Sequence, residues 1–101
     1  MMDRTLPVGA KRTGSSPEFA ADNVPAALLA DHSTAAGVYG RVNVLAGELD
    51  FVFAAKPDES VHLRVGDELI VLPEEAHHVV PGPGMRFLIE FYRDGGEAPA
   101  D

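Results

Sequence analysis

The sequence predicts a small all-β protein, an antiparallel sandwich or barrel built from short strands. Apolar and polar residues alternate at period two in several stretches, which is the periodicity of a half-buried strand. Gly- and Pro-containing turns separate these stretches at short intervals. Only one short segment, 25–30, has the composition of a helical turn. Many short strands divided by turns are typical of antiparallel sandwiches and barrels.

The composition narrows the functional classes. A chain of 101 residues fits one domain. It contains no cysteine, which excludes disulfides, thiolate metal sites and cysteine nucleophiles. Its net charge of −8 disfavours binding to nucleic acid or to an anionic membrane, because both rely on Lys and Arg. No apolar run approaches the length of about 20 residues that spans a bilayer. We therefore expect a soluble cytoplasmic protein.

The ends of the chain differ in composition from its middle. Residues 1–16 are mostly polar and contain Gly and Pro, so we expect a flexible arm there. Residues 17–93 form the single predicted domain, which begins with an edge strand near 18–20. In the helical turn at 25–30, Asn23 is the expected N-cap. The tail 94–101 has no apolar anchor and is expected to be disordered.

The strands of the domain follow from alternation and turns. Segments 38–44 and 48–53 read as a hairpin that turns near Ala46 and Gly47, with one apolar and one mostly wet face. Further strands are expected at 61–63, 69–72, 77–80 and 85–92, divided by the turns around Gly66, Pro73 and Pro81.

Two segments resemble the sequence motifs of cupins. GDELIVLPEEAH at 66–77 is similar to the second cupin motif, in which a glycine, a strand and a Pro-containing turn precede a histidine. VLAGEL at 44–49 is similar to the close of the first motif. Together with segments 24–26, 31–34, 37–41 and 87–92, they resemble the small single-domain YeaR/TehB-like cupins over nearly all of the predicted domain.

The resemblance implies a cupin-type jelly-roll β-barrel, usually a homodimer, with one pocket inside the barrel. Some members are associated with tellurite resistance or with responses to nitrate and nitric oxide. Methyl transfer is set aside, because the chain has no room for a methyltransferase domain. We expect a divalent metal (zinc, iron or nickel), a small oxidised or anionic molecule, or both inside the barrel. The alternative is a non-catalytic ligand-binding or dimerisation module without metal.

The resemblance also implies candidate metal ligands. A typical cupin site takes two histidines and a glutamate from the first motif and one histidine from the second. Here only His32 and His77 match by position, and Glu90 is the candidate third ligand. Two alternatives remain open. His77 could be an ordinary hydrogen-bonded barrel histidine, and Glu90 would face outward if the apolar set in its strand, Met85, Phe87, Ile89 and Phe91, faces the core.

Other polar residues are candidates for the pocket or its rim. His77 and His78 are adjacent on a strand and must point to opposite faces, so His78 is expected at the rim or at a dimer interface. Thr34 is a further candidate near the pocket. Tyr39 and Arg41 share a strand face, where they could bind a small anion or form a cross-strand surface pair. His62 is expected to be a solvated histidine.

Overall fold

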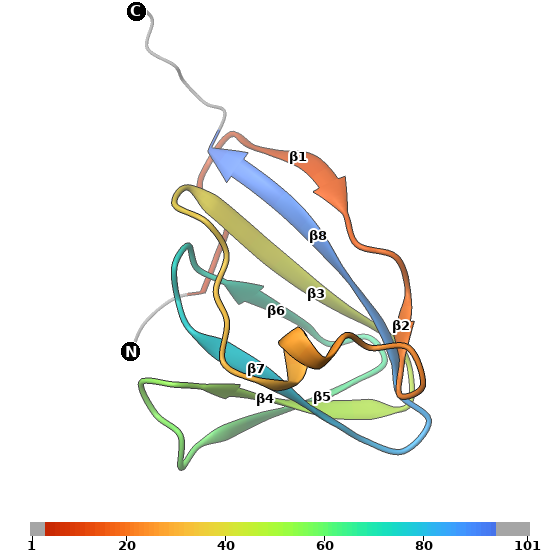
Figure 1. Cartoon of the computed structure of the whole chain (residues 1–101). Helices are drawn as coiled ribbons and strands as arrows, with labels where there is room; N and C mark the ends of the chain where they lie inside the picture. Colours follow the sequence, from red (N-terminus) through yellow and green to blue (C-terminus); the bar gives the residue numbers. More distant parts are fainter. Residues whose placement is uncertain (1–3, 95–101) are drawn as a thin grey trace, which may run out of the picture.

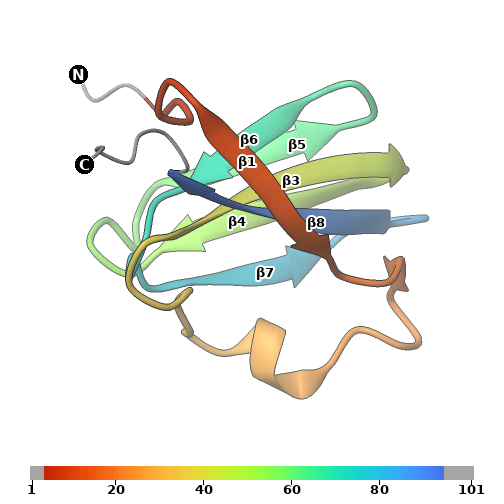
Figure 2. The same cartoon turned by 90° about the horizontal axis from the view of Figure 1, so that it is seen from above.

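The computed structural model describes residues 4–94, which form two antiparallel sheets packed face to face (Figures 1 and 2). One sheet has the order β1-β8-β3-β6, with β2 also paired to β8, and the other has the order β5-β4-β7. The all-β prediction is confirmed. The elements are β1 (Ala10–Ser15), β2 (Phe19–Ala20), the 3-10 helix η1 (Ala26–Leu29), β3 (Val38–Ala46), β4 (Glu48–Phe53), β5 (Ser60–Arg64), β6 (Glu68–Val71), β7 (His77–Pro81) and β8 (Arg86–Asp94).

The core lies between the two sheets and is supplied by alternate residues of their strands. In β4, Leu49, Phe51 and Phe53 are buried while the residues between them are half-buried. In β8, Phe87 and Ile89 face the same core from the opposite sheet. This alternation is the period-two pattern of the sequence, and burial of these large apolar side chains is the main force that stabilises the sandwich.

The predicted hairpin between β3 and β4 is wrong. These strands belong to different sheets: β3 pairs with β6 and β8, whereas β4 pairs with β5 and β7. Gly47 lies between them with φ 63°, a left-handed conformation that favours glycine. A Cβ on Gly47 would lie 2.3 Å from the carbonyl oxygen of Pro83. The chain therefore crosses from one sheet to the other where two backbones pass in contact.

The N-terminal segment contains structure that the sequence analysis did not predict. Within the expected flexible arm, β1 pairs with β8 and extends the sheet, although five of its six residues are exposed. Its polar composition is that of an edge strand, which needs no apolar face, and this is why hydropathy did not reveal it. The edge strand expected near 18–20 is β2. Of the predicted tail, Asp94 ends β8, and residues 95–101 lie outside the described part.

The segment between β2 and β3 crosses one end of the sandwich beside β7 (Figures 1 and 2). Its η1 has Pro25 at the N-cap position and no side-chain cap, so the expected capping role of Asn23 is wrong. The Asn23 carboxamide instead accepts a hydrogen bond from the Ala20 backbone. Leu28 points from η1 toward the core. Within residues 4–94, no helix has the length and apolar character to cross a bilayer.

Substituting Gly47 with alanine should be much more destabilising than the same change at Gly66. Both glycines have positive φ, 63° and 96°, so alanine incurs a backbone cost of about 1–2 kcal/mol at either position. Only at Gly47 would the new Cβ overlap backbone atoms, whereas nothing lies within 4 Å at Gly66. Overpacking adds about 1–3 kcal/mol. Urea unfolding of G47A and G66A measures the difference, and equal losses would contradict the close approach at Gly47.

Candidate functional site: a two-histidine cavity

A short antiparallel bridge joins the segment after η1 to β7. His32 and His77 lie opposite each other and exchange both backbone hydrogen bonds, His32 N–H to His77 O at 2.9 Å and His77 N–H to His32 O at 2.8 Å. We call this pair the histidine bridge. At the next position outward, His78 Nδ1 lies 2.8 Å from Asp31 Oδ1. Because neighbouring strand residues point to opposite faces, the two bridged rings lie on one face, and Asp31 and His78 lie on the other.

The bridged rings line a cavity of about 270 Å³ at this end of the sandwich. The cavity is mostly apolar, and its polar groups are the two imidazoles and two hydroxyls. Thr34, a predicted pocket residue, is among the lining residues, and its hydroxyl donates to the Val38 carbonyl at 2.6 Å. The lining residues are Leu28, His32, Ser33, Thr34, Ala35, Val38, Phe51, Val71, His77, Ile89 and Phe91.

Backbone carbonyls set the tautomer of both cavity histidines. His32 Nδ1 lies 3.0 Å from the Ala30 oxygen, and His77 Nδ1 lies 2.7 Å from the Glu75 oxygen. A carbonyl oxygen can only accept, so each Nδ1 carries the proton and each neutral ring keeps its acceptor lone pair on Nε2. The ring centroids are 4.4 Å apart, with an edge-on geometry. Within the described chain, no protein group hydrogen-bonds either Nε2.

His77 is held in an aromatic environment that keeps its ring uncharged. Its side chain is buried, stacked on Phe51 at 5.3 Å between centroids, with Phe53 at its edge. Burial lowers the pKa of His77; the carbonyl of Glu75 opposes this shift and the neighbouring His32 adds to it. At neutral pH the ring is therefore a hydrogen-bond acceptor or a metal ligand through Nε2, and not a cation.

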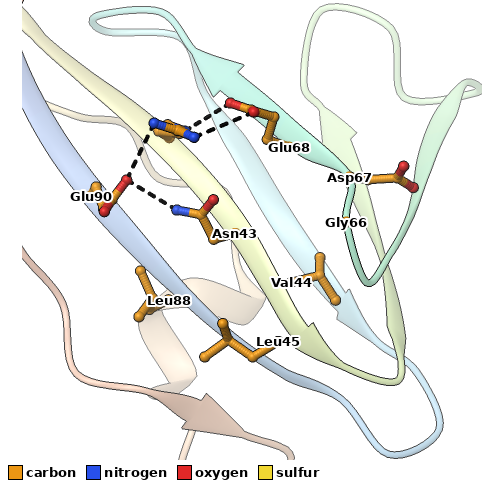
Figure 3. Close-up of a pocket in the computed structure, with 9 residues that line it drawn as sticks. Asn43, Val44, Leu45, Gly66, Asp67, Glu68, Leu88 and Glu90 are labelled. Carbon is orange, nitrogen blue, oxygen red and sulfur yellow. Dashed lines mark hydrogen bonds and ion pairs between the residues drawn. The ribbon is translucent and has the colours of Figure 1, made fainter.

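Glu90, the third expected metal ligand, does not join the two histidines. Its carboxylate lies on the outer face of β8, where it accepts a hydrogen bond from Asn43 Nδ2 at 3.1 Å (Figure 3). It also pairs with Arg12 at 3.3 Å. Phe87 and Ile89 of the same strand face the core, and alternation along the strand therefore turns Glu90 outward. This is the second of the two orientations considered for Glu90 in the sequence analysis. Across residues 4–94, no group of three or more His, Asp or Glu side chains is arranged to hold a metal ion.

Tyr39 and Arg41 also lie outside the cavity, on the outer face of the sheet. Tyr39 is paired with Tyr92 across the strands, and Arg41 with Glu90. Arg41 Nε is 2.7 Å from Glu68 Oε1, an ion pair by distance, although Nε makes no hydrogen bond. Arg41 borders an open groove of about 420 Å³, where the carboxylates of Glu68 and Glu90 neutralise its guanidinium (Figure 3). This arrangement is the cross-strand surface pair and offers little to an anion.

His62 is exposed, as expected, but it is not free in solvent. On the outer face of β4 and β5, its Nδ1 lies 2.6 Å from Asp50 and its Nε2 lies 2.6 Å from Glu48. These hydrogen bonds, with Asp50 first, raise the pKa of His62, because both ring nitrogens must donate. The two nitrogens face different carboxylates, so the three groups do not converge on one ion.

Sequence reasoning missed two residues that shape the cavity. Phe51, the stacking partner of His77, had a usable signal, since it is central in the apolar alternation of β4. Glu75 had none, because a glutamate in a turn is usually solvated. Its backbone oxygen nevertheless accepts the hydrogen bond from His77 Nδ1, and its carboxylate pairs with Arg4, 71 positions away in the sequence.

The stability that His77 contributes to the metal-free protein should be lost as the pH drops below about 6.5. The unfolded ring titrates near pH 6.5, whereas the folded ring resists protonation because its pKa is lowered. The contribution is thus complete above pH 6.5 and is lost as the pH falls toward the folded pKa. Urea unfolding of wild type and H77F in EDTA measures this slope. An equally steep slope in H77F would contradict the assignment.

The comparisons with known proteins agree with this fold. A family model described as TehB-like domain matches residues 14–89. A comparison with curated proteins found no match. A crystal structure of a protein from E. coli (strain K12) is similar with a TM-score of 0.83 and 23% identity, covering 96% of this chain and 94% of that one.

Two other solved structures relate the fold to named proteins. TehB from Haemophilus influenzae matches with a TM-score of 0.77 and 21% identity over 85% of this chain, which corresponds to only 32% of TehB. A cupin protein from Bacteroides fragilis matches with a TM-score of 0.60 and 19% identity, over 88% of this chain and 74% of that one. The fold is that of a small cupin, and the chain belongs to the TehB-like family.

Proposed function

We propose that the cavity binds a small uncharged molecule that has an apolar body and one hydrogen-bond donor. The observation that carries this proposal is the pair of Nε2 acceptors on His32 and His77, which have no protein donor in the described chain. The apolar wall supplies the driving force for binding, and a donor on the ligand satisfies a half-buried acceptor. Pockets of this kind take their affinity from apolar contact and their orientation from a few polar groups.

The charge of the cavity favours a neutral ligand over an anion. None of the lining residues found in the described chain is Lys, Arg, Asp or Glu. The pKa of His77 is lowered by its burial, so this ring does not provide a cation near neutral pH. An oxyanion in such a wall would lose its hydration without a compensating charge. The earlier expectation of an oxidised or anionic ligand is therefore replaced by an uncharged one.

The size of the cavity limits the ligand to a single ring or a short chain. Its volume of about 270 Å³ equals about nine water molecules at about 30 Å³ each. Phenol suits the cavity as a probe, because it is flat, apolar and carries one donor. Toluene has nearly the same shape and has no donor, so it is a matched comparison.

Phenol should bind the protein about fivefold more tightly than toluene, which corresponds to one net hydrogen bond of about 1 kcal/mol. Titration followed by backbone amide NMR shifts would locate both probes at the cavity residues and give both affinities. In H77F and H32F the preference for phenol should shrink, while H78Q should retain it, because His78 lies on the opposite face. No binding of phenol, or a full preference that persists in the H32F/H77F double variant, would contradict the proposal.

A divalent metal is the second candidate for the same site. The observation in its favour is that each histidine donates its Nδ1 proton to a backbone carbonyl, the arrangement usual for metal-ligating histidines. The residues fit in part: His32 and His77 would supply two imidazole donors, and water or the ligand would have to complete the coordination. A metal there would polarise a bound molecule as a Lewis acid.

Zinc titration by calorimetry tests whether His32 and His77 bind a metal. We expect one Zn²⁺ per chain, lost in H32A and in H77A and retained in H62A, the control for the surface histidine between two carboxylates. The absence of a zinc site in the wild type, or a site that survives in the H32A/H77A double variant, would contradict it.

A further inference from the structure

The side chain of Arg4 contacts the turn that leads into β7. Its Nη1 and Nη2 donate to the two carboxylate oxygens of Glu75 at 2.7 and 2.6 Å, a bidentate pair in which both side chains are mostly buried. Nη1 also lies 3.2 Å from the Ile70 oxygen, and the guanidinium lies 3.9 Å above the centre of the Phe53 ring. Bidentate geometry and stacking on an aromatic face are both specific to arginine.

Glu75 connects this ion pair to the cavity. Its carboxylate also accepts the Leu72 N–H at 3.1 Å, and its backbone oxygen accepts the Nδ1 proton of His77 at 2.7 Å. Phe53, which lies under Arg4, is at the edge of the same imidazole, 6.0 Å between centroids. Two paths therefore lead from Arg4 to His77, one through Glu75 and one through Phe53.

The turn between β6 and β7 is strained and needs such support. Glu74 has φ 62°, in the left-handed region that is unfavourable for any residue with a Cβ. A residue keeps such a strained conformation only when several contacts around it hold the backbone in place. Here the supports are the hydrogen bond from Glu74 N–H to the Thr34 oxygen at 3.2 Å and the clamp of Arg4 on Glu75.

We propose that Arg4 is a positioning residue for the cavity. By holding the carboxylate of Glu75, it keeps the Glu75 backbone oxygen at the Nδ1 proton of His77 and so leaves the Nε2 lone pair facing the cavity. The use of this lone pair in binding rests on the function proposed above, whereas the positioning itself does not. Arg4 lies outside residues 14–89, the part that the family model matches.

The ionisation of Glu75 agrees with this role. Burial alone would raise its pKa, but the hydrogen bonds from Arg4 and from the Leu72 backbone outweigh burial and lower it. The carboxylate is therefore charged at neutral pH, as a bidentate clamp requires.

The test compares R4Q with R12Q in the intact, ligand-free chain. Arg12 is a matched control, because it is also an arginine of the N-terminal segment and also pairs with a carboxylate, Glu90. The readout is the ring nitrogen chemical shifts of His77 by NMR, which report the tautomer. E75Q removes the carboxylate partner of the same ion pair and keeps the backbone oxygen of residue 75. R4K keeps the positive charge but cannot form two parallel hydrogen bonds with the carboxylate.

We expect the Nδ1–H tautomer in about five of six His77 rings of the wild type and of R12Q, as one hydrogen bond of about 1 kcal/mol would give. R4Q and E75Q should each lower this share to about half, with no further loss in the double variant, and R4K should be intermediate. Phenol affinity should fall by up to about twofold in R4Q, in proportion to the share of the Nδ1–H tautomer, and stay unchanged in R12Q.

A wild-type tautomer in folded R4Q, or in folded E75Q, would overturn the proposal even if both variants were less stable. If phenol does not bind the wild type, the proposed ligand class fails, and the tautomer measurement still decides whether Arg4 positions His77.

Discussion

The bridge between His32 and His77 is the interaction on which the candidate site depends. It consists of two backbone hydrogen bonds, yet it sets the position of four side chains. Alternation along the two short segments sends both bridged rings into the cavity and turns Asp31 and His78 outward as a pair. The same bridge ties the segment that carries η1 to β7, so Leu28 closes one side of the cavity. Without it, His32 would belong to a surface loop.

Local patterns predicted the features that depend on neighbours in sequence. Alternation correctly predicted opposite faces for His77 and His78, because period two is a property of a single strand. It could not predict that Gly47 carries the chain into a second sheet, since that crossing depends on contact with the Pro83–Gly84 backbone. Local patterns could not predict the Arg4–Glu75 pair either, because the two residues are 71 positions apart in the sequence.

The carboxylates discussed above lie outside the cavity, although the chain as a whole is acidic. Three carboxylates are paired with basic side chains outside the cavity: Glu90, the expected metal ligand, with Arg12, Glu75 with Arg4, and Asp50 with His62. The cavity holds the imidazoles of His32 and His77 in a mostly apolar wall. No Lys, Arg, Asp or Glu of the described chain lines this cavity, which supports the proposal of a neutral ligand over an anionic one.

Amide hydrogen exchange at His32 measures whether the histidine bridge persists in solution. We expect the His32 amide, which donates to His77 O in the bridge, to be protected to nearly the same degree as the His77 amide, because the two hydrogen bonds must open together. A His32 amide that exchanges as fast as an exposed loop amide, while His77 remains protected, would show that the bridge does not persist in solution. It would also remove His32 from the cavity.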